Sequence, residues 1–110
     1  MSFLQRIVLK IRQIKNLFFE PSIIKEWKKN GKPLPPPYFL KQMTIGKYQL
    51  KYEINLFVET GTYMGDMIEA QKQFFNNIYS IELDETLFEK AKNRFNKYSH
   101  IKLYHGDSSN

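Results

Sequence analysis

The sequence predicts an α/β protein that contains the N-terminal half of a doubly wound parallel sheet, preceded by a basic helical extension. From Asn55 onward, short apolar runs alternate with amphipathic stretches in the order strand, helix, strand, helix, strand. Before that point the apolar residues have helical spacing, and residues 1–54 carry 11 Lys and Arg against 3 Asp and Glu. A sheet of this kind also predicts right-handed crossovers between its strands.

The composition of the 110 residues excludes several other classes of protein. A hydrophobic content of 42% and an aromatic content of 15% exclude an intrinsically disordered chain. The absence of cysteine excludes disulfides and thiolate zinc sites. No apolar run is long enough to span a bilayer, and Arg6, Lys10 and Arg12 interrupt the apolar stretch that a signal peptide would need. We therefore expect a cytoplasmic chain with one hydrophobic core.

Residues 1–30 are predicted to form a basic amphipathic helical extension. Apolar residues recur at spacings of three and four over residues 3–19, with Arg6, Lys10, Arg12 and Lys15 between them. Such a stripe packs on its own domain or on a second copy of the chain, or it lies on a membrane surface or a partner protein. The pattern leaves these alternatives open. Ser22–Lys29 is predicted to form a second, short helix.

Residues 31–54 are predicted to contain a proline-rich linker and a short helix. Gly31 supplies a turn, and Pro33 with Pro35–Pro37 favours an extended polyproline conformation and hence a stiff connector. Tyr38–Lys51 is then expected to be helical.

Residues 55–110 are predicted to be a partial ligand-binding domain that is incomplete at its C-terminus. The expected strands are Leu56–Val58, Ile78–Ile81 and Ile101–Tyr104. The expected helices are Asp66–Phe75 and Glu85–Lys97, the second with Asp84 as its N-cap. The pattern stops after the third strand, so we expect an incomplete sheet.

Three polar features fall at the carboxyl ends of the predicted strands, where such sheets bind ligands. The first is the turn Glu59–Gly65, in which glycines allow a close approach of a ligand to the backbone. The second is Glu82, which follows Gly61 by 21 residues, close to the spacing at which an acid meets a ribose hydroxyl. The third is Gly106–Asp107. Together they predict a site for an adenosine-type ligand.

The charges around the first turn discriminate between adenosine ligands. A dinucleotide site requires G-x-G-x-x-G, whereas this turn has Gly61 and Gly65 separated by three residues. Glu59 and Asp66 would repel a pyrophosphate, and they suit the ammonium and sulfonium groups of S-adenosylmethionine.

At these residues the sequence resembles the class I S-adenosylmethionine-dependent methyltransferases, over roughly residues 33–110. The matching motifs are Leu56–Asp66, Ile78–Asp84 and Ile101–Ser108. The resemblance implies that S-adenosyl-L-methionine is the cofactor and that Glu82 binds its ribose. It implies that Leu83 lines the adenine and that Asp107 with Ser108 borders the adenine amino group. It further implies that the methionine end is surrounded by residues of the first turn: Glu59, Gly61, Thr62, Tyr63 and Gly65.

The sequence departs from the family at Tyr63, where glycine is common, and in ending after the third strand. The chain is therefore interpreted as truncated, and no catalytic residue is assigned. His105 is interpreted as a packed or solvated strand-end residue rather than a base. The acids Glu82, Asp84 and Glu85 are explained by ribose binding and helix capping, so no metal site is expected.

The resemblance leaves the methyl acceptor open but favours a small molecule or a saccharide. Two other functions are retained as alternatives: a cofactor-binding remnant without activity, and a basic module that binds a membrane or nucleic acid. Nucleic acid is disfavoured because no recognised nucleic-acid motif accompanies the basic residues.

Overall fold

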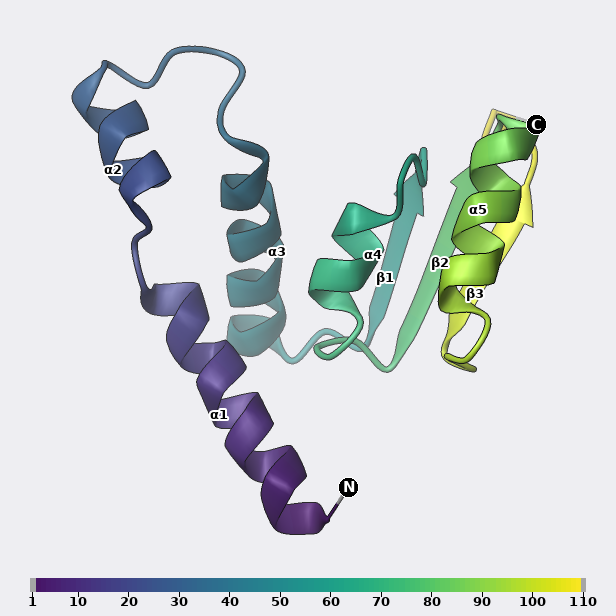
Figure 1. Ribbon diagram of the computed structural model, residues 1–110, viewed down its shortest axis with the longest axis horizontal. Coiled ribbons are helices and arrows are strands. Elements are labelled where there is room, and N and C mark those ends of the chain that lie inside the picture. The colour runs from purple at the N-terminus through teal and green to yellow at the C-terminus, as the bar shows by residue number, and fades with distance from the viewer. Residues whose placement is uncertain (1, 110) are drawn as a thin grey trace. The chain divides into compact units, whose positions relative to one another are not determined.

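The computed structural model describes residues 2–109, which form two compact units that divide between Lys47 and Tyr48. The eight elements follow the predicted order (Figure 1). In chain order they are α1 (Phe3–Phe18), α2 (Ser22–Lys29), α3 (Tyr38–Tyr52), β1 (Leu56–Thr60), α4 (Asp66–Gln71), β2 (Asn77–Glu82), α5 (Glu85–Phe95) and β3 (Ile101–His105). The boundary between the units falls inside α3, whereas the domain limits expected at residues 30 and 54 stay predictions.

The first unit is helical and has a small core. A capping box between Ser2 and Gln5 starts α1, and Leu17 at its other end packs against Gly46 of α3. A Cβ at Gly46 would lie 2.8 Å from Leu17, so glycine allows this close approach. Leu17 is the buried residue of α1, so packing within the chain covers the apolar stripe only near the C-terminal end of the helix. Across residues 2–109, no helix combines the length and hydrophobicity that crossing a membrane requires.

The proline-rich segment is not the extended connector that its composition predicts. The chain turns at Asn30 and Gly31, bends at Leu34 and Pro35, and has a cis peptide bond between these last two residues. The indole N–H of Trp27 donates a hydrogen bond of 2.8 Å to the carbonyl of Pro33. This bond ties Pro33 to α2, and the bends at Leu34 and Pro35 interrupt the extended course of the segment.

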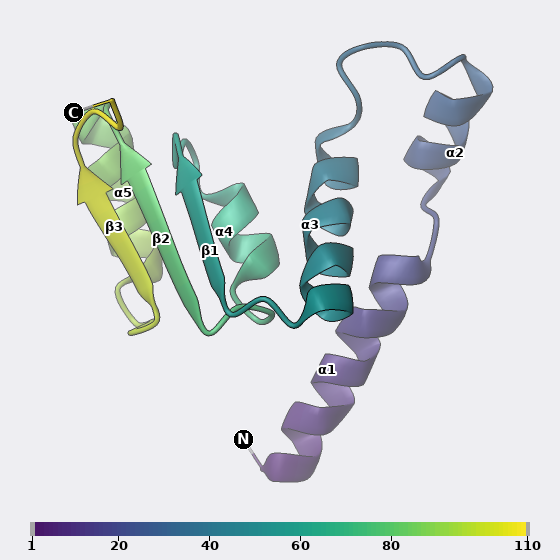
Figure 2. The same cartoon turned by 180° about the vertical axis from the view of Figure 1, so that it is seen from behind.

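The second unit contains a three-stranded parallel sheet in the order β1-β2-β3. Leu56 pairs with Asn77, and Ile78 pairs with Ile101. Helices α4 and α5 lie on the same face of the sheet (Figures 1 and 2). With the helices in front, each strand lies to the right of the preceding one in Figure 1, which is the right-handed crossover expected of such units. The predicted α/β class is therefore confirmed.

The core of this unit forms between the helices and one face of the sheet. The buried apolar residues come from α4, α5, the loop between α4 and β2, and the helix-facing positions of β2 and β3: Met67, Ile68, Phe75, Ile78, Ala91, Phe95 and Ile101. Phe57 of β1 joins them through its ring contact with Phe75. This core fixes the strand ends that carry the predicted site.

Several predicted boundaries are wrong by a few residues. Helix α4 ends at Gln71, not at Phe75, because Phe75 leaves the helix to pack against Phe57 with ring centroids 5.2 Å apart. The strands run further than predicted at their carboxyl ends, so Glu59 lies within β1 and does not end it. Helix α5 ends at Phe95, before the predicted Lys97. The Asp84 N-cap is confirmed, since its carboxylate accepts a 2.8 Å bond from the Leu87 N–H.

Candidate functional site

The carboxyl ends of the three strands lie side by side and bring the three predicted loops to one edge of the sheet. Beyond β1, the Gly61 N–H donates to the Ile81 carbonyl at 2.8 Å. Beyond β3, the Gly106 N–H donates to the Glu82 carbonyl at 3.0 Å. Both glycine loops are therefore tied to the end of β2, and Glu82 lies between them.

Glu82 is the best-anchored polar side chain at this edge. Only 7% of the residue is exposed. Its Oε1 accepts a 2.7 Å hydrogen bond from the Tyr63 N–H, and its Oε2 accepts a 3.0 Å bond from the Asp84 N–H. A carboxylate oxygen has two lone pairs, so each oxygen retains capacity for a further donor. The two amides thus hold the carboxylate in one orientation.

The turn before α4 has a backbone conformation that suits a close ligand. Gly61 and Gly65 have φ angles of 80° and 86°, in the left-handed region that glycine adopts without strain. A Cβ at Gly61 would meet no atom within 4 Å, so the space above this residue is open. Tyr63 also has a positive φ of 54°. This angle explains why glycine is suited to the Tyr63 position, and it aims the Tyr63 N–H at Glu82.

A chain of hydrogen bonds connects the first turn to β1 through a buried serine. The Ser80 hydroxyl donates to Glu59 Oε1 at 2.9 Å, and Thr62 Oγ1 lies 2.5 Å from Ser80 Oγ. Because the Ser80 proton is directed at the carboxylate, the Thr62 hydroxyl donates to Ser80. Ser80 is fully buried in β2 and connects Glu59 to Thr62, a contact that the sequence does not predict. The sequence feature that could have indicated Ser80 is a polar residue inside a strand that is predicted to be buried.

The environment of Glu59 favours its protonated form relative to an exposed glutamate. Burial raises the pKa of the Glu59 carboxyl, and the negative charge of Glu82 acts in the same direction. The hydrogen bond from Ser80 partly opposes this shift of the pKa. A cation beside Glu59 would therefore favour its ionised form.

Arg94 of α5 holds the first turn from outside the site. Its Nη1 donates to the Met64 carbonyl at 2.8 Å and to Asp66 Oδ1 at 3.2 Å. Its Nη2 lies 3.6 Å from Glu69 of α4. The sequence gives no local signal for this role, because the partners precede Arg94 by 25 to 30 residues.

The remaining predicted residues lie in the loops after β2 and β3. Leu83 is 67% exposed at the end of β2. Asp107 Oδ1 accepts hydrogen bonds from the Ser109 N–H and hydroxyl, and these bonds lower the pKa of Asp107. Ser108 lies in the same exposed turn. Hydrogen bonds therefore connect Glu59 to Thr62 through Ser80, and Tyr63 to Glu82. The other predicted residues, Leu83, Asp107 and Ser108, lie in the neighbouring loops.

His105 is a packed strand-end residue. Its Nε2 donates a 3.0 Å hydrogen bond to the Leu83 carbonyl, and its ring stacks on Phe88 with centroids 5.3 Å apart. These contacts support the structural interpretation of His105, since the Nε2 proton is directed at a backbone acceptor. Within residues 2–109, no three acidic or histidine side chains gather in a way that could hold a metal ion.

Comparison with known proteins gives one related sequence and several similar structures. No protein-family model matches the chain. The type II methyltransferase M.AccI of Acinetobacter calcoaceticus is 30% identical over 71 residues, which are 64% of this chain and 13% of that protein. The S-adenosylhomocysteine-bound Podospora anserina methyltransferase PaMTH1 matches with a TM-score of 0.60 and 17% identity, over 100% of this chain and 52% of that one. The S-adenosylmethionine-bound amino pentose methyltransferase CalS10 of Micromonospora echinaspora matches with a TM-score of 0.53 and 13% identity, over 81% of this chain and 37% of that one.

These matches define the class of fold. The chain has the Rossmann-like α/β fold of the class I S-adenosylmethionine-dependent methyltransferases, which confirms the resemblance found in its sequence. It spans about half the length of PaMTH1 and a smaller share of the other two proteins.

Proposed function

We propose that this chain supplies the S-adenosyl-L-methionine-binding part of a methyltransferase. The observation that carries the proposal is the buried Glu82 carboxylate, held at the end of β2 by two backbone N–H groups with acceptor capacity left on both oxygens. A pair of ribose hydroxyls presents two neighbouring donors that match two such oxygens. The names of the similar structures, which were solved with S-adenosylmethionine or S-adenosylhomocysteine, support the same cofactor.

The other residues of the edge fit the remainder of this cofactor. Glu59, whose burial disfavours its negative charge, would gain a partner in the ammonium or sulfonium group. The open space at Gly61 admits a ligand close to the backbone. The cofactor supplies an activated methyl group, and the protein's part is to bind and orient it. In this role Thr62 and Ser80 keep the Glu59 carboxylate in place.

Isothermal titration of the 110-residue chain with S-adenosylmethionine and with S-adenosylhomocysteine tests the binding. Glu82→Gln places an amide NH₂ against one of the two backbone donors, so we expect the affinity to fall about 10- to 100-fold. Glu89→Gln on the exposed side of α5 removes the same charge away from the edge and is the matched control. Equal affinity of the Glu82 variant and the control would contradict the assignment of Glu82.

The methyl acceptor that we propose is a small molecule, with a saccharide as the favoured class. The amino pentose methyltransferase CalS10 supports this choice, because its name indicates a sugar acceptor and its fold is similar. Transfer of tritiated methyl groups from S-adenosylmethionine to a panel of sugar nucleotides by the full-length protein tests the proposal. Cofactor binding without transfer to any acceptor would favour the alternative function, a cofactor-binding remnant.

A further inference from the structure

We propose that α1 binds the surface of an anionic lipid bilayer, lying parallel to the membrane plane with its apolar side chains inserted. This role is separate from the cofactor site, so it stands or falls independently of the proposed methyltransferase function. The starting observation is the exposure of α1, where 80% of Phe3 and 70% of Leu4 are exposed. Ile7, Val8 and Ile11 are also exposed, so the apolar residues continue over three turns of the helix.

The arrangement of charge around α1 is that of an interfacial helix. With 3.6 residues per turn, the exposed apolar residues share one face: Phe3, Leu4, Ile7, Val8, Ile11 and Phe18. Arg6 and Lys10 border this face on one side and Arg12 borders it on the other, while Lys15 lies on the Val8 side of the face, near the C-terminal end of the helix. Helix α1 contains no acidic residue. Long basic side chains at such borders place their charges among lipid headgroups while their stems cover the apolar surface.

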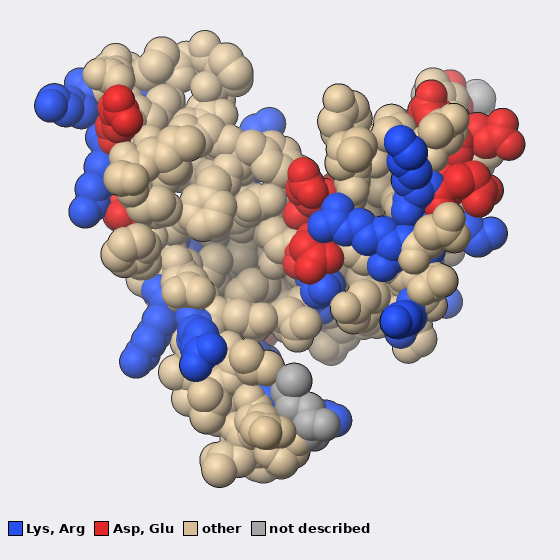
Figure 3. Space-filling view, in the orientation of Figure 1, with Lys and Arg blue, Asp and Glu red and all other residues tan. Residues whose placement is uncertain are grey.

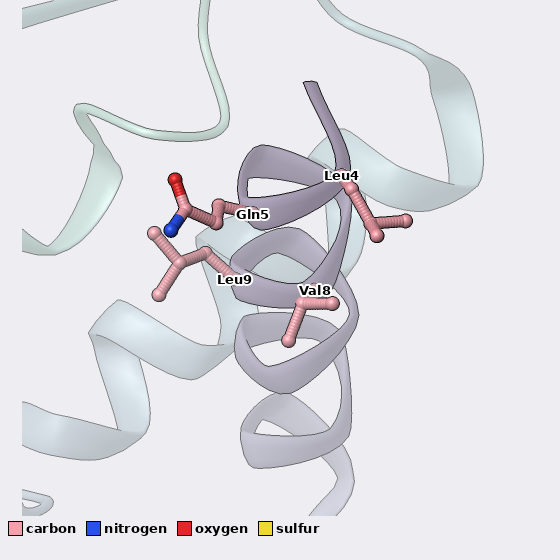
Figure 4. A pocket seen from close by; sticks show the side chains of 4 residues that line it. All are labelled: Leu4, Gln5, Val8 and Leu9. Atoms are coloured by element: carbon pink, nitrogen blue, oxygen red, sulfur yellow. The ribbon is translucent and has the colours of Figure 1, made fainter. Parts of the chain in front are cut away.

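The surface of α1 also has an open hollow of apolar character. Its lining residues are Leu4, Gln5, Val8 and Leu9 (Figure 4). Figure 3 shows uncharged atoms over the N-terminal part of α1 and basic side chains at its margins. Three of these four side chains are aliphatic, so a hydrocarbon group in the hollow would contact mainly apolar surface.

The charges favour lipid over the other occupants of such a face. Two copies that met through this face would bring their Arg and Lys side chains together with no acidic residue of α1 between them. A nucleic acid would place phosphates against the basic borders but would leave Phe3, Leu4 and Ile7 against a polar surface. An anionic bilayer offers negative headgroups and an apolar interior at the same time. Because α1 does not qualify as a membrane-spanning helix, the geometry corresponds to binding at the surface.

Co-sedimentation of the full 110-residue chain with vesicles tests the proposal. We expect binding to phosphatidylcholine vesicles that contain about 30 mol% phosphatidylglycerol, and much weaker binding to pure phosphatidylcholine. Leu4→Asp is expected to weaken binding about tenfold, because it places a charge on the inserted face. Lys10→Gln and Lys15→Gln are each expected to weaken it about fivefold, and only with the anionic vesicles.

Leu34→Asp is the matched control, since Leu34 is an exposed leucine of the same unit that lies outside α1. It should bind vesicles like the unchanged chain, and circular dichroism should show all variants to be folded. Equal binding to both kinds of vesicle, or unchanged binding of Leu4→Asp, would overturn the proposal. So would a dimer in analytical ultracentrifugation that Leu4→Asp dissociates, or binding to a DNA duplex in place of vesicles.

Discussion

Glu59 is the residue whose chemistry most clearly couples the site to the stability of the fold. Burial and the charge of Glu82 raise the pKa of the Glu59 carboxyl above its ordinary value of 4.5. A raised pKa in the folded state means that protonated Glu59 contributes stability below this ordinary value. That contribution is lost as the pH rises through the raised pKa of the folded state. At neutral pH the ionised carboxylate is therefore a cost to the fold that a bound cation would reduce.

Glu59→Gln is predicted to stabilise the protein at neutral pH and to weaken cofactor binding. The amide oxygen still accepts from Ser80, while the buried charge and its repulsion from Glu82 are removed. We expect the midpoint of thermal unfolding to rise by about 4 °C at pH 7.5. The difference should shrink toward pH 4, where the native carboxyl is protonated. Scanning calorimetry at both values measures this, and an equal shift at pH 4 and pH 7.5 would refute the argument.

Among the elements, α5 supports the turn before α4 as well as covering the sheet. Arg94 binds the Met64 carbonyl and Asp66, and the neighbouring Phe95 ring fills the space beside Gly65. A Cβ at Gly65 would lie 2.7 Å from Phe95 Cε2, and Phe95 is buried in the core. The shape of the turn therefore depends on the position of α5.

Gly65→Ala and Gly61→Ala form a matched pair that separates packing from backbone strain. The φ angle is 80° at Gly61 and 86° at Gly65, but only Gly65 faces a side chain. We expect Gly61→Ala to cost about 1 kcal/mol of unfolding free energy and Gly65→Ala about 3 kcal/mol. Urea denaturation measures both values. Equal losses of stability would show that Phe95 moves aside without cost.

Gly61→Ala should nevertheless have the larger direct effect on binding relative to its effect on stability. Its methyl group would enter the open space above the turn, where the ligand approaches the backbone. Calorimetric titration of the two folded variants distinguishes these effects.

At the scale of the whole molecule, the two units differ in how much apolar surface they bury. The buried apolar residues of the helical unit are Leu17, Ile24 and Met43, whereas the sheet unit has the larger core. Strand β2 is hydrogen-bonded on both sides, and β1 and β3 each pair on one side within the described sheet. Local stability should therefore rise from α1 to β2.

Hydrogen exchange measured by mass spectrometry should show this gradient directly. We expect amides of β2 to exchange at least about 100-fold more slowly than those of α1, since few buried contacts oppose local opening of the N-terminal helix. Protection of α1 equal to that of β2 would mean that the helix is held by contacts beyond Leu17.

The sequence was sufficient to predict features that depend on neighbouring residues. The apolar runs predicted all three strands, and Asp84 was predicted as the cap of α5. Features that depend on tertiary contacts were missed. Phe74 and Phe75 continue the apolar pattern of α4 in the sequence, so the helix is predicted to end at Phe75. In the structure Phe75 lies outside the helix and packs against Phe57. The proline-rich segment was predicted to be extended because composition does not reveal its hydrogen bond with Trp27.

In the candidate site, too, features set by neighbouring residues could be predicted and features set by tertiary contacts could not. Glu82 could be predicted from its place after a strand and its spacing from Gly61. Its two amide donors could not, because the Tyr63 N–H reaches it only through a positive φ. Arg94 was missed since its partners come from a distant part of the chain. Spacing thus predicts candidate ligand-binding groups such as Glu82, while the groups that hold them in place become visible only in the fold.

The buried Ser80 has a consequence for how this protein would respond to selection. Ser80 occupies the central strand and accommodates the Glu59 carboxylate of the neighbouring strand, at a position where an apolar side chain would contribute more to folding. Heat selection applied without any requirement for binding should therefore enrich Ser80→Val and Glu59→Gln early. The surviving variants would be more stable proteins that lack the hydrogen bond between Ser80 and Glu59, so a thermostability screen of this chain needs a binding screen beside it.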